Sequence, residues 1–197
     1  MFNWRSVFNP FEKYNEKQLF FVGILFYIIG CVISYTFNLT FNGAIDIHYL
    51  QIGQTLQNAF FENTIIVFIM TCVLFILGKT FNRKTRLIDI LNVALIYRIP
   101  IYLASLIVIL PFLQKATDKI MNDLSVNKLK IDSPEMIWVS LAGILLLIFV
   151  IFSIYLVVKG FKVATNFKSW KQTTILAFVL IIIEYLSIFT IHNFLTR

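Results

Sequence analysis

The stretch Gln18–Phe37 reads QLFFVGILFYIIGCVISYTF and contains no charged residue. About 20 mostly apolar residues are enough for a helix to cross the roughly 30 Å hydrocarbon core of a bilayer. Further stretches of the same kind predict spans at about residues 59–79, 88–113, 136–158 and 174–192. We therefore expect an all-α, polytopic membrane bundle of five transmembrane helices, forming one domain over residues 1–197.

The composition of the chain agrees with this fold class. Apolar residues make up 59% of the sequence and charged residues only 14%, whereas a soluble domain has about 45–50% and about 25%. These values exclude a disordered chain, a collagen-like chain and an ordinary cytosolic domain. Both cysteines, Cys31 and Cys72, fall inside expected spans and are interpreted as small buried hydrophobic residues.

The distribution of the 17 lysines and arginines predicts the orientation of the chain. Most of them lie before the first span, between the second and third spans, and between the fourth and fifth spans. The positive-inside rule therefore puts the N-terminus in the cytoplasm and the C-terminus outside. The net charge of +7 mainly reflects this bias, so we expect no nucleic-acid partner.

Residues 1–17 form a lead that we expect in the cytosol or at the membrane interface. Trp4, Val7, Phe8, Phe11 and Tyr14 recur near helical spacing in it. Because Pro10 disfavours helix at the residue before it, the sequence predicts a short turn and then a helix from Pro10. The aromatic residues form either an amphipathic interfacial segment or a belt that fixes the first span.

The layout of the chain resembles the bacterial branch of the Yip family of membrane proteins (Ypt/Rab-interacting proteins). The resemblance rests on the lead with Trp4 and the NPFEKY stretch (Asn9–Tyr14), followed by five spans. It also rests on DILNVALIYRIPIYL (Asp89–Leu103) after a basic loop, and on VVKGFKVATNFKSWKQ (Val157–Gln172) at the end of the fourth span.

The resemblance implies a multi-pass protein of the cell inner membrane with no firmly established chemistry. Eukaryotic members of the family are associated with vesicle trafficking and bind prenylated small GTPases. Their Asp-Leu-x-Gly-Pro and Tyr-Gly-Tyr elements are absent here, so the resemblance does not carry small-GTPase binding to this chain.

Two charged residues fall where the bilayer penalises charge most. Arg98 lies about ten residues into the third span, so about 15 Å along the helix, and Glu184 lies at a similar depth in the fifth. A charge near mid-membrane must face the bundle or a water-filled cavity. One hypothesis is that Arg98 and Glu184 contact each other or share water. The alternative is that each is satisfied separately, by carbonyls freed near Pro100 or by protonation of the glutamate.

Pro100 adds a second feature to the third span. Because proline cannot donate to the carbonyl of Ile96, we expect a kink there, and Pro111 should end or bend the span. Asp89 and Asn92 are polar residues on the first turns of the same span. A broken span with ionisable residues is typical of transport sites, but such kinks also occur in purely structural spans.

A basic cluster precedes the third span. Its residues are Lys79, Arg83, Lys84 and Arg86. Such clusters attract anionic lipid headgroups at about 1 kcal/mol per charge, here on the cytoplasmic face, although the cluster could serve as a topology determinant alone.

No enzyme motif is present, whether a nucleophile elbow, a His-Glu-x-x-His, a P-loop or a dinucleotide fingerprint. We therefore expect no catalytic residue, no metal and no cofactor. The leading hypothesis is a non-enzymatic scaffold or organiser of lipid or partner proteins, with membrane-protein partners or a second copy of the chain. The alternative is a transporter or channel component that uses Arg98 and Glu184 near the Pro100 kink.

Overall fold

The computed structural model describes residues 8–41, 43, 45–49, 53–125 and 133–195. Trp4 and Val7 of the predicted aromatic stripe lie outside the described residues. The described helices are α2 (Pro10–Lys13), α3 (Glu16–Thr36), α4 (Leu56–Phe81), α5 (Leu87–Ile96), α6 (Ile99–Val108), α7 (Pro111–Ser125), α8 (Pro134–Thr165) and α9 (Trp170–Leu195). Two short strands, β1 (Leu39–Thr40) and β2 (His48–Tyr49), pair antiparallel between α3 and α4.

Five helical stretches are long and apolar enough to cross a membrane. They are Glu16–Thr36, Leu56–Phe81, Leu87–Val108, Pro134–Thr165 and Trp170–Asn193. The expected all-helical membrane fold is thus confirmed, with a minimal two-stranded ladder that the sequence did not predict.

The third span departs from the single helix expected over 88–113. It is divided into α5 and α6 by a break at Tyr97 and Arg98, and Pro100 sits in the first turn of α6. Proline lacks the N–H that would bond the Ile96 carbonyl, and its ring crowds that carbonyl. The span ends at Val108 and α7 begins at Pro111. The expected kink near Pro100 and the interruption at Pro111 are both confirmed.

Local capping sets the helix starts. Asn15 and Gln18 form a reciprocal capping box at α3, which satisfies backbone donors that the first helical turn leaves free. Ser133 caps α8, with Pro134 in its first turn. At the lead, α2 begins at Pro10 as predicted.

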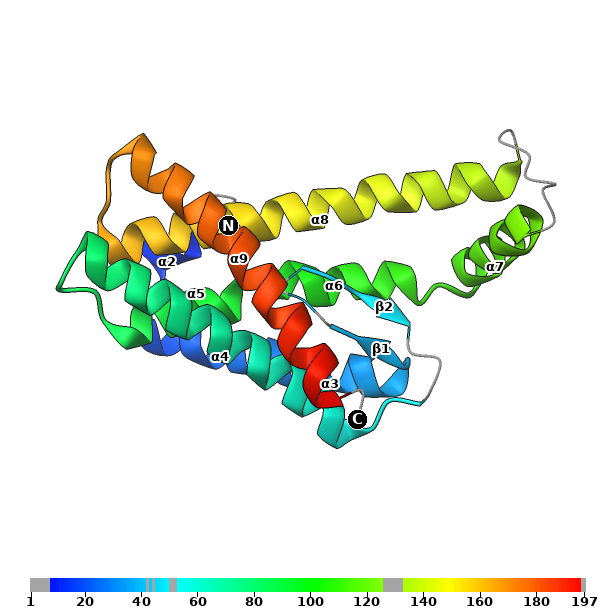
Figure 1. The fold of residues 1–197 in the computed structure, drawn as a ribbon, viewed down its shortest axis with the longest axis horizontal. Helices are drawn as coiled ribbons and strands as arrows, with labels where there is room; N and C mark the ends of the chain where they lie inside the picture. Colours follow the sequence, from blue (N-terminus) through cyan, green and yellow to red (C-terminus); the bar gives the residue numbers. More distant parts are fainter. Residues whose placement is uncertain (1–7, 42, 44, 50–52, 126–132, 196–197) are drawn as a thin grey trace.

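Two ends of the bundle can be distinguished (Figure 1). The α4–α5 and α8–α9 connections lie together at one end, which we call the basic end because Lys79, Arg83, Lys84 and Arg86 are found there. The other end holds α7 and the start of α8. Successive spans therefore run in alternating directions.

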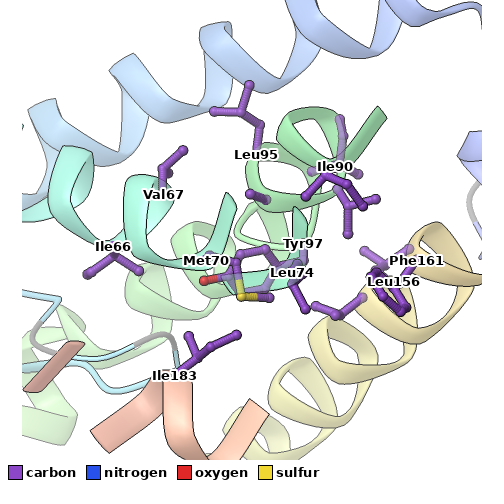
Figure 2. Close-up of a cluster of buried hydrophobic side chains, with 14 of the residues drawn as sticks. Ile66, Val67, Met70, Leu74, Ile90, Leu95, Tyr97, Leu156, Phe161 and Ile183 are labelled. Atoms are coloured by element: carbon purple, nitrogen blue, oxygen red, sulfur yellow. The ribbon is translucent and has the colours of Figure 1, made fainter. Parts of the chain in front are cut away.

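The core lies between α3, α4, α5 and α8, with α9 resting on α4 (Figure 2). It is formed by buried side chains from different helices, among them Met70 and Leu74 of α4, Leu95 of α5 and Phe161 of α8. In the most apolar part of the third span 72% of the residues are buried, compared with 17% in the fourth span and 22% in the fifth. The third span is thus the centre of the bundle, whereas α8 and α9 present broad apolar faces outward.

Candidate functional site: a buried polar cluster around Arg98

Arg98 lies at the break between α5 and α6, midway along the third span. Its relative exposure is 0%, although it is the largest of the fully buried side chains among the described residues. A buried guanidinium is tolerated only where its donors are hydrogen-bonded. The surroundings of Arg98 therefore decide what the residue can do.

Two polar side chains from the bundle bind the guanidinium. Arg98 Nε donates to the Tyr102 hydroxyl at 2.9 Å, and Nη2 donates to Asn63 Oδ1 at 2.9 Å. The Tyr102 hydroxyl in turn donates to Asn63 Oδ1 at 3.0 Å. Arg98, Tyr102 and Asn63 thus form a closed hydrogen-bonded triangle between the third span and α4.

Two aromatic rings lie against the same guanidinium. The Arg98 Cζ atom is 5.4 Å from the centre of the Phe41 ring and 5.2 Å from that of Tyr102. The rings themselves meet edge to face at 5.3 Å. Cation–π contacts of this kind grow stronger when the cation is desolvated, so they help to hold the charge of Arg98 inside the bundle.

Phe41 belongs to a non-helical segment that enters the bundle. We call the described residues 39–41, 43 and 45–49 the hairpin segment. The strands β1 and β2 pair within it, with Leu39 opposite Tyr49 and Thr40 opposite His48. Leu39 and Phe41 are fully buried, and the segment reaches the midpoint of the third span at Arg98. Non-helical backbone at membrane depth is tolerated only where protein covers it and satisfies its polar groups.

Arg98 and Glu184 both form hydrogen bonds with the backbone of this segment. Arg98 Nη1 donates to the Gly43 carbonyl at 3.5 Å, and the Ile45 N–H donates to Glu184 Oε2 at 3.2 Å. A Cβ added at Gly43 would overlap Glu184 Oε1, so the glycine leaves room for the carboxylate where it now lies. The structure therefore brings Arg98 and Glu184 to backbone groups only two positions apart, at Gly43 and Ile45.

The hypothesis that Arg98 and Glu184 contact each other directly stays a prediction. The alternative was that carbonyls freed near Pro100 accept hydrogen bonds from Arg98, and this part of it is wrong. The acceptors of Arg98 come instead from α4, from Tyr102 and from the hairpin segment. Glu184 also lines a cavity of about 560 Å³ between α8 and α9, together with Tyr97 and Met70.

A buried carboxylate, that of Glu62, holds the entry of the hairpin segment. Glu62 of α4 is 3% exposed, and its Oε2 accepts from Thr40 Oγ1 at 3.0 Å and from Gln54 Nε2 at 3.1 Å. The Leu39 carbonyl accepts from Ser34 Oγ at 2.7 Å. Glu62 and Asn63 are adjacent on α4, so one turn of that helix supports both halves of the polar cluster.

Asp89 and Asn92 lie apart from this cluster, at the basic end. Arg86 donates to both oxygens of Asp89, at 2.9 and 2.7 Å, and pairs with Glu16 at 2.8 Å. The hydrogen bonds and charge of Asp89 raise the pKa of Arg86 above its ordinary value. Asn92 is 1% exposed and donates from Nδ2 to the Glu16 carbonyl at 3.0 Å. These residues join the start of α3 to α5.

The basic cluster is therefore not uniform. Arg86 is engaged by two carboxylates, whereas Arg83 and Lys84 have exposed side chains. Lys79 donates to the Arg83 carbonyl at 2.9 Å and lies over the Phe75 ring at 5.2 Å. The side chains of Lys79, Arg83 and Lys84 are all exposed at this end of the bundle.

Sequence reasoning missed Glu62, Asn63 and Tyr102, and it treated the hairpin segment as an ordinary loop. The sequence did contain a pattern that indicates the strands of this segment. Apolar residues or glycine occupy every second position from Leu39 to Tyr49, which is the period of a strand. Within the described residues, no group of three or more His, Cys, Asp or Glu is placed to hold a metal ion.

Five candidate spans wrapped around a buried polar cluster define a polytopic helical membrane protein. A family model described as the Yip1 domain matches residues 11–191, so the chain belongs to the Yip1 domain family. Neither the curated proteins nor the solved structures that were compared with the chain gave a match.

Proposed function

We propose that this chain is a non-enzymatic scaffold or organiser in the membrane, acting on lipid or on partner membrane proteins. The observation that carries the proposal is the complete burial of Arg98. Its donors are directed to Asn63, Tyr102 and the Gly43 carbonyl. A charge used to hold the chain's own backbone favours a structural role over a path for a passing solute.

The outward faces of α8 and α9 support the second half of the proposal. Only 17% and 22% of the residues in their most apolar windows are buried, and side chains such as Ile144, Ile148 and Ile181 are more than half exposed. In a bilayer such faces meet lipid or the helices of another membrane protein, including a second copy of this chain.

The charge distribution supports a defined orientation. With the basic end in the cytoplasm, the N-terminus is cytoplasmic and the C-terminus lies outside. Lys79, Arg83 and Lys84 then face the anionic headgroups of the cytoplasmic leaflet. The family and the similarity to its bacterial branch favour the cell inner membrane as the location, without small-GTPase binding.

A transporter or channel component is the second candidate. The cavity of about 560 Å³ lined by Glu184 favours it, because an ionisable residue beside an intramembrane cavity is a common element of transport paths. The two candidates differ in what they require of Arg98. A path needs the guanidinium in contact with water or solute, whereas a scaffold needs it closed off.

Two experiments on the full chain separate the candidates. In proteoliposomes, the scaffold role predicts no ion or solute flux above that of empty vesicles, and no change with Arg98→Ala. In intact membranes, a photo-crosslinker at Ile144 or Ile181 should give discrete adducts with one or a few proteins or with a second copy. The same crosslinker at the buried positions Ile90 and Ile101 serves as the control.

The proposal has clear failing outcomes. Flux that is carried by the wild-type chain and lost with Arg98→Ala would establish the transport role instead. Crosslinks at Ile144 and Ile181 that reach only lipid would remove the protein-partner half and leave an organiser of lipid.

A further inference from the structure

A pocket of about 540 Å³ lies at the basic end, where α3, α5 and the last turns of α8 meet. Its walls combine polar and apolar groups. The polar groups come from Asn15, Glu16, Arg86, Asp89 and Asn92. This pocket is separate from the cluster around Arg98, and the proposed scaffold role does not use it.

Asn92, which lines this pocket, carries a buried oxygen without a partner among the described residues. Asn92 is 1% exposed, and its Oδ1 atom makes no hydrogen bond within the described part of the chain. Its amide nitrogen is occupied by the Glu16 carbonyl. A buried acceptor left unsatisfied is costly, so Oδ1 calls for a donor beyond the described residues.

The charges of the pocket point to the chemistry of that donor. Arg86 contributes one positive charge, and Glu16 and Asp89 contribute two negative charges around it. The remaining negative charge and the free acceptor of Asn92 suit a small cation that carries N–H groups. The Arg86 side chain is 60% exposed and can still donate to a phosphate.

An apolar groove continues from the pocket along the spans. It has a volume of about 530 Å³ and lies between α3, α6 and α8, and it shares Tyr14 and Leu19 with the polar pocket. Val22 and Leu103 on its rim are exposed, so the groove opens to the surrounding lipid. An occupant from the bilayer can enter it sideways.

We propose that the pocket and groove together bind one phospholipid with a primary ammonium headgroup, of the phosphatidylethanolamine class. The ammonium donates to Asn92 Oδ1 and lies beside Glu16 and Asp89. The phosphate meets Arg86, and an acyl chain lies in the groove. A trimethylated headgroup has no N–H to donate, and a headgroup without a cation leaves the carboxylates unbalanced.

The test is competitive lipid binding to the full-length chain. The protein is purified from membranes, exposed to equal amounts of phosphatidylethanolamine, phosphatidylcholine and phosphatidylglycerol, and read by native mass spectrometry. We expect phosphatidylethanolamine to be retained about tenfold over phosphatidylcholine, the ratio that one hydrogen bond to a charged group provides.

Variants assign that preference to the two parts of the site. Asn92→Leu should abolish the tenfold ratio, whereas Asn92→Asp, which keeps an acceptor, should retain it. Asn193→Leu, the same change at an exposed position, should leave the ratio unchanged. Leu103→Trp, which fills the groove, should reduce retention of all three lipids, and Leu106→Trp on an exposed face of the same helix should not.

Three results would overturn the proposal. The first is equal retention of the three lipids by the wild-type chain. The second is a preference for phosphatidylglycerol, which would assign lipid binding to the basic cluster. The third is a phosphatidylethanolamine preference that survives Asn92→Leu, which would place the headgroup elsewhere. None of these results bears on flux or on partner proteins, so the scaffold role is tested independently.

Discussion

Asn63 of α4 accepts from Arg98 Nη2 at 2.9 Å, in the middle of the bundle, at a position where neither side chain meets solvent. The same oxygen accepts from the Tyr102 hydroxyl at 3.0 Å. This one amide thus binds a charged donor and a neutral donor from the third span. It links the centre of the bundle to the helix that also carries Glu62.

Replacing Asn63 should destabilise the protein strongly. Asn63→Leu leaves the Arg98 and Tyr102 donors without their shared acceptor, so we expect a loss of about 3 kcal/mol in the free energy of unfolding. Asn193→Leu is the matched control, because both asparagines donate to the carbonyl four residues earlier but Asn193 is exposed. Thermal unfolding of the purified proteins in detergent measures the difference. Equal unfolding temperatures for the two variants would contradict the role given to Asn63.

The Tyr102 hydroxyl can be tested without creating a large cavity. Tyr102→Phe removes one acceptor for Arg98 Nε and one donor to Asn63 while it keeps the ring. We expect a cost of about 1–3 kcal/mol, measured by the same unfolding experiment. Tyr185→Phe on the exposed face of α9 should cost close to nothing, and a comparable loss there would show that the assay does not resolve the cluster.

Gly43 leaves room for the Glu184 carboxylate beside the hairpin segment. A Cβ at this position would overlap Glu184 Oε1, so Gly43→Ala must push that carboxylate aside and strain or break its hydrogen bond from the Ile45 N–H. We expect a cost of about 1–3 kcal/mol in the free energy of unfolding, the range for one hydrogen bond to a charged group, measured by thermal unfolding in detergent. Gly143→Ala on α8 should be tolerated, because a Cβ there meets no atom within 4 Å. An unaffected Gly43→Ala variant would show that Glu184 does not approach the segment this closely.

Glu62 should anchor the start of the hairpin segment inside the bundle. Its carboxylate accepts from Thr40 and Gln54 inside the bundle. Glu62→Ala would leave both donors buried without this acceptor, at a cost of about 2–3 kcal/mol. Exposed Glu12 of α2 provides the control as Glu12→Ala. Limited proteolysis between α3 and α4 should then cut the Glu62 variant faster than the control, and equal rates would be evidence against this anchoring role.

The spans could be predicted from the sequence because they depend on local properties. Apolar length located all five, and the chemistry of Pro100 and Pro111 located both interruptions of the third span. Asn15 and Ser133 cap helices through contacts only three residues away. Each of these features is decided by neighbours in the chain.

The partners of Arg98 could not be predicted in the same way. The contacts to Asn63 and Gly43 span 35 and 55 residues of sequence, so their formation depends on how the helices pack. The sequence indicated only that Arg98 and Glu184 need partners, because both are expected near the middle of the membrane. The alternation from Leu39 to Tyr49 indicated a strand-like segment, but only the assembled bundle shows that it reaches mid-span.

The central claim is that Arg98 and Glu184 hold the backbone of the hairpin segment. The most direct measurement is a charge-swap cycle in which unfolding is compared for Arg98→Glu, Glu184→Arg and the double variant. A glutamate cannot donate to the Gly43 carbonyl, and an arginine cannot accept from the Ile45 N–H. We therefore expect the double variant to be no more stable than the weaker single variant. Recovery of the double variant to near wild-type stability would show that the Gly43 carbonyl and the Ile45 N–H do not depend on which of the two side chains is the donor and which the acceptor, and would contradict the claim.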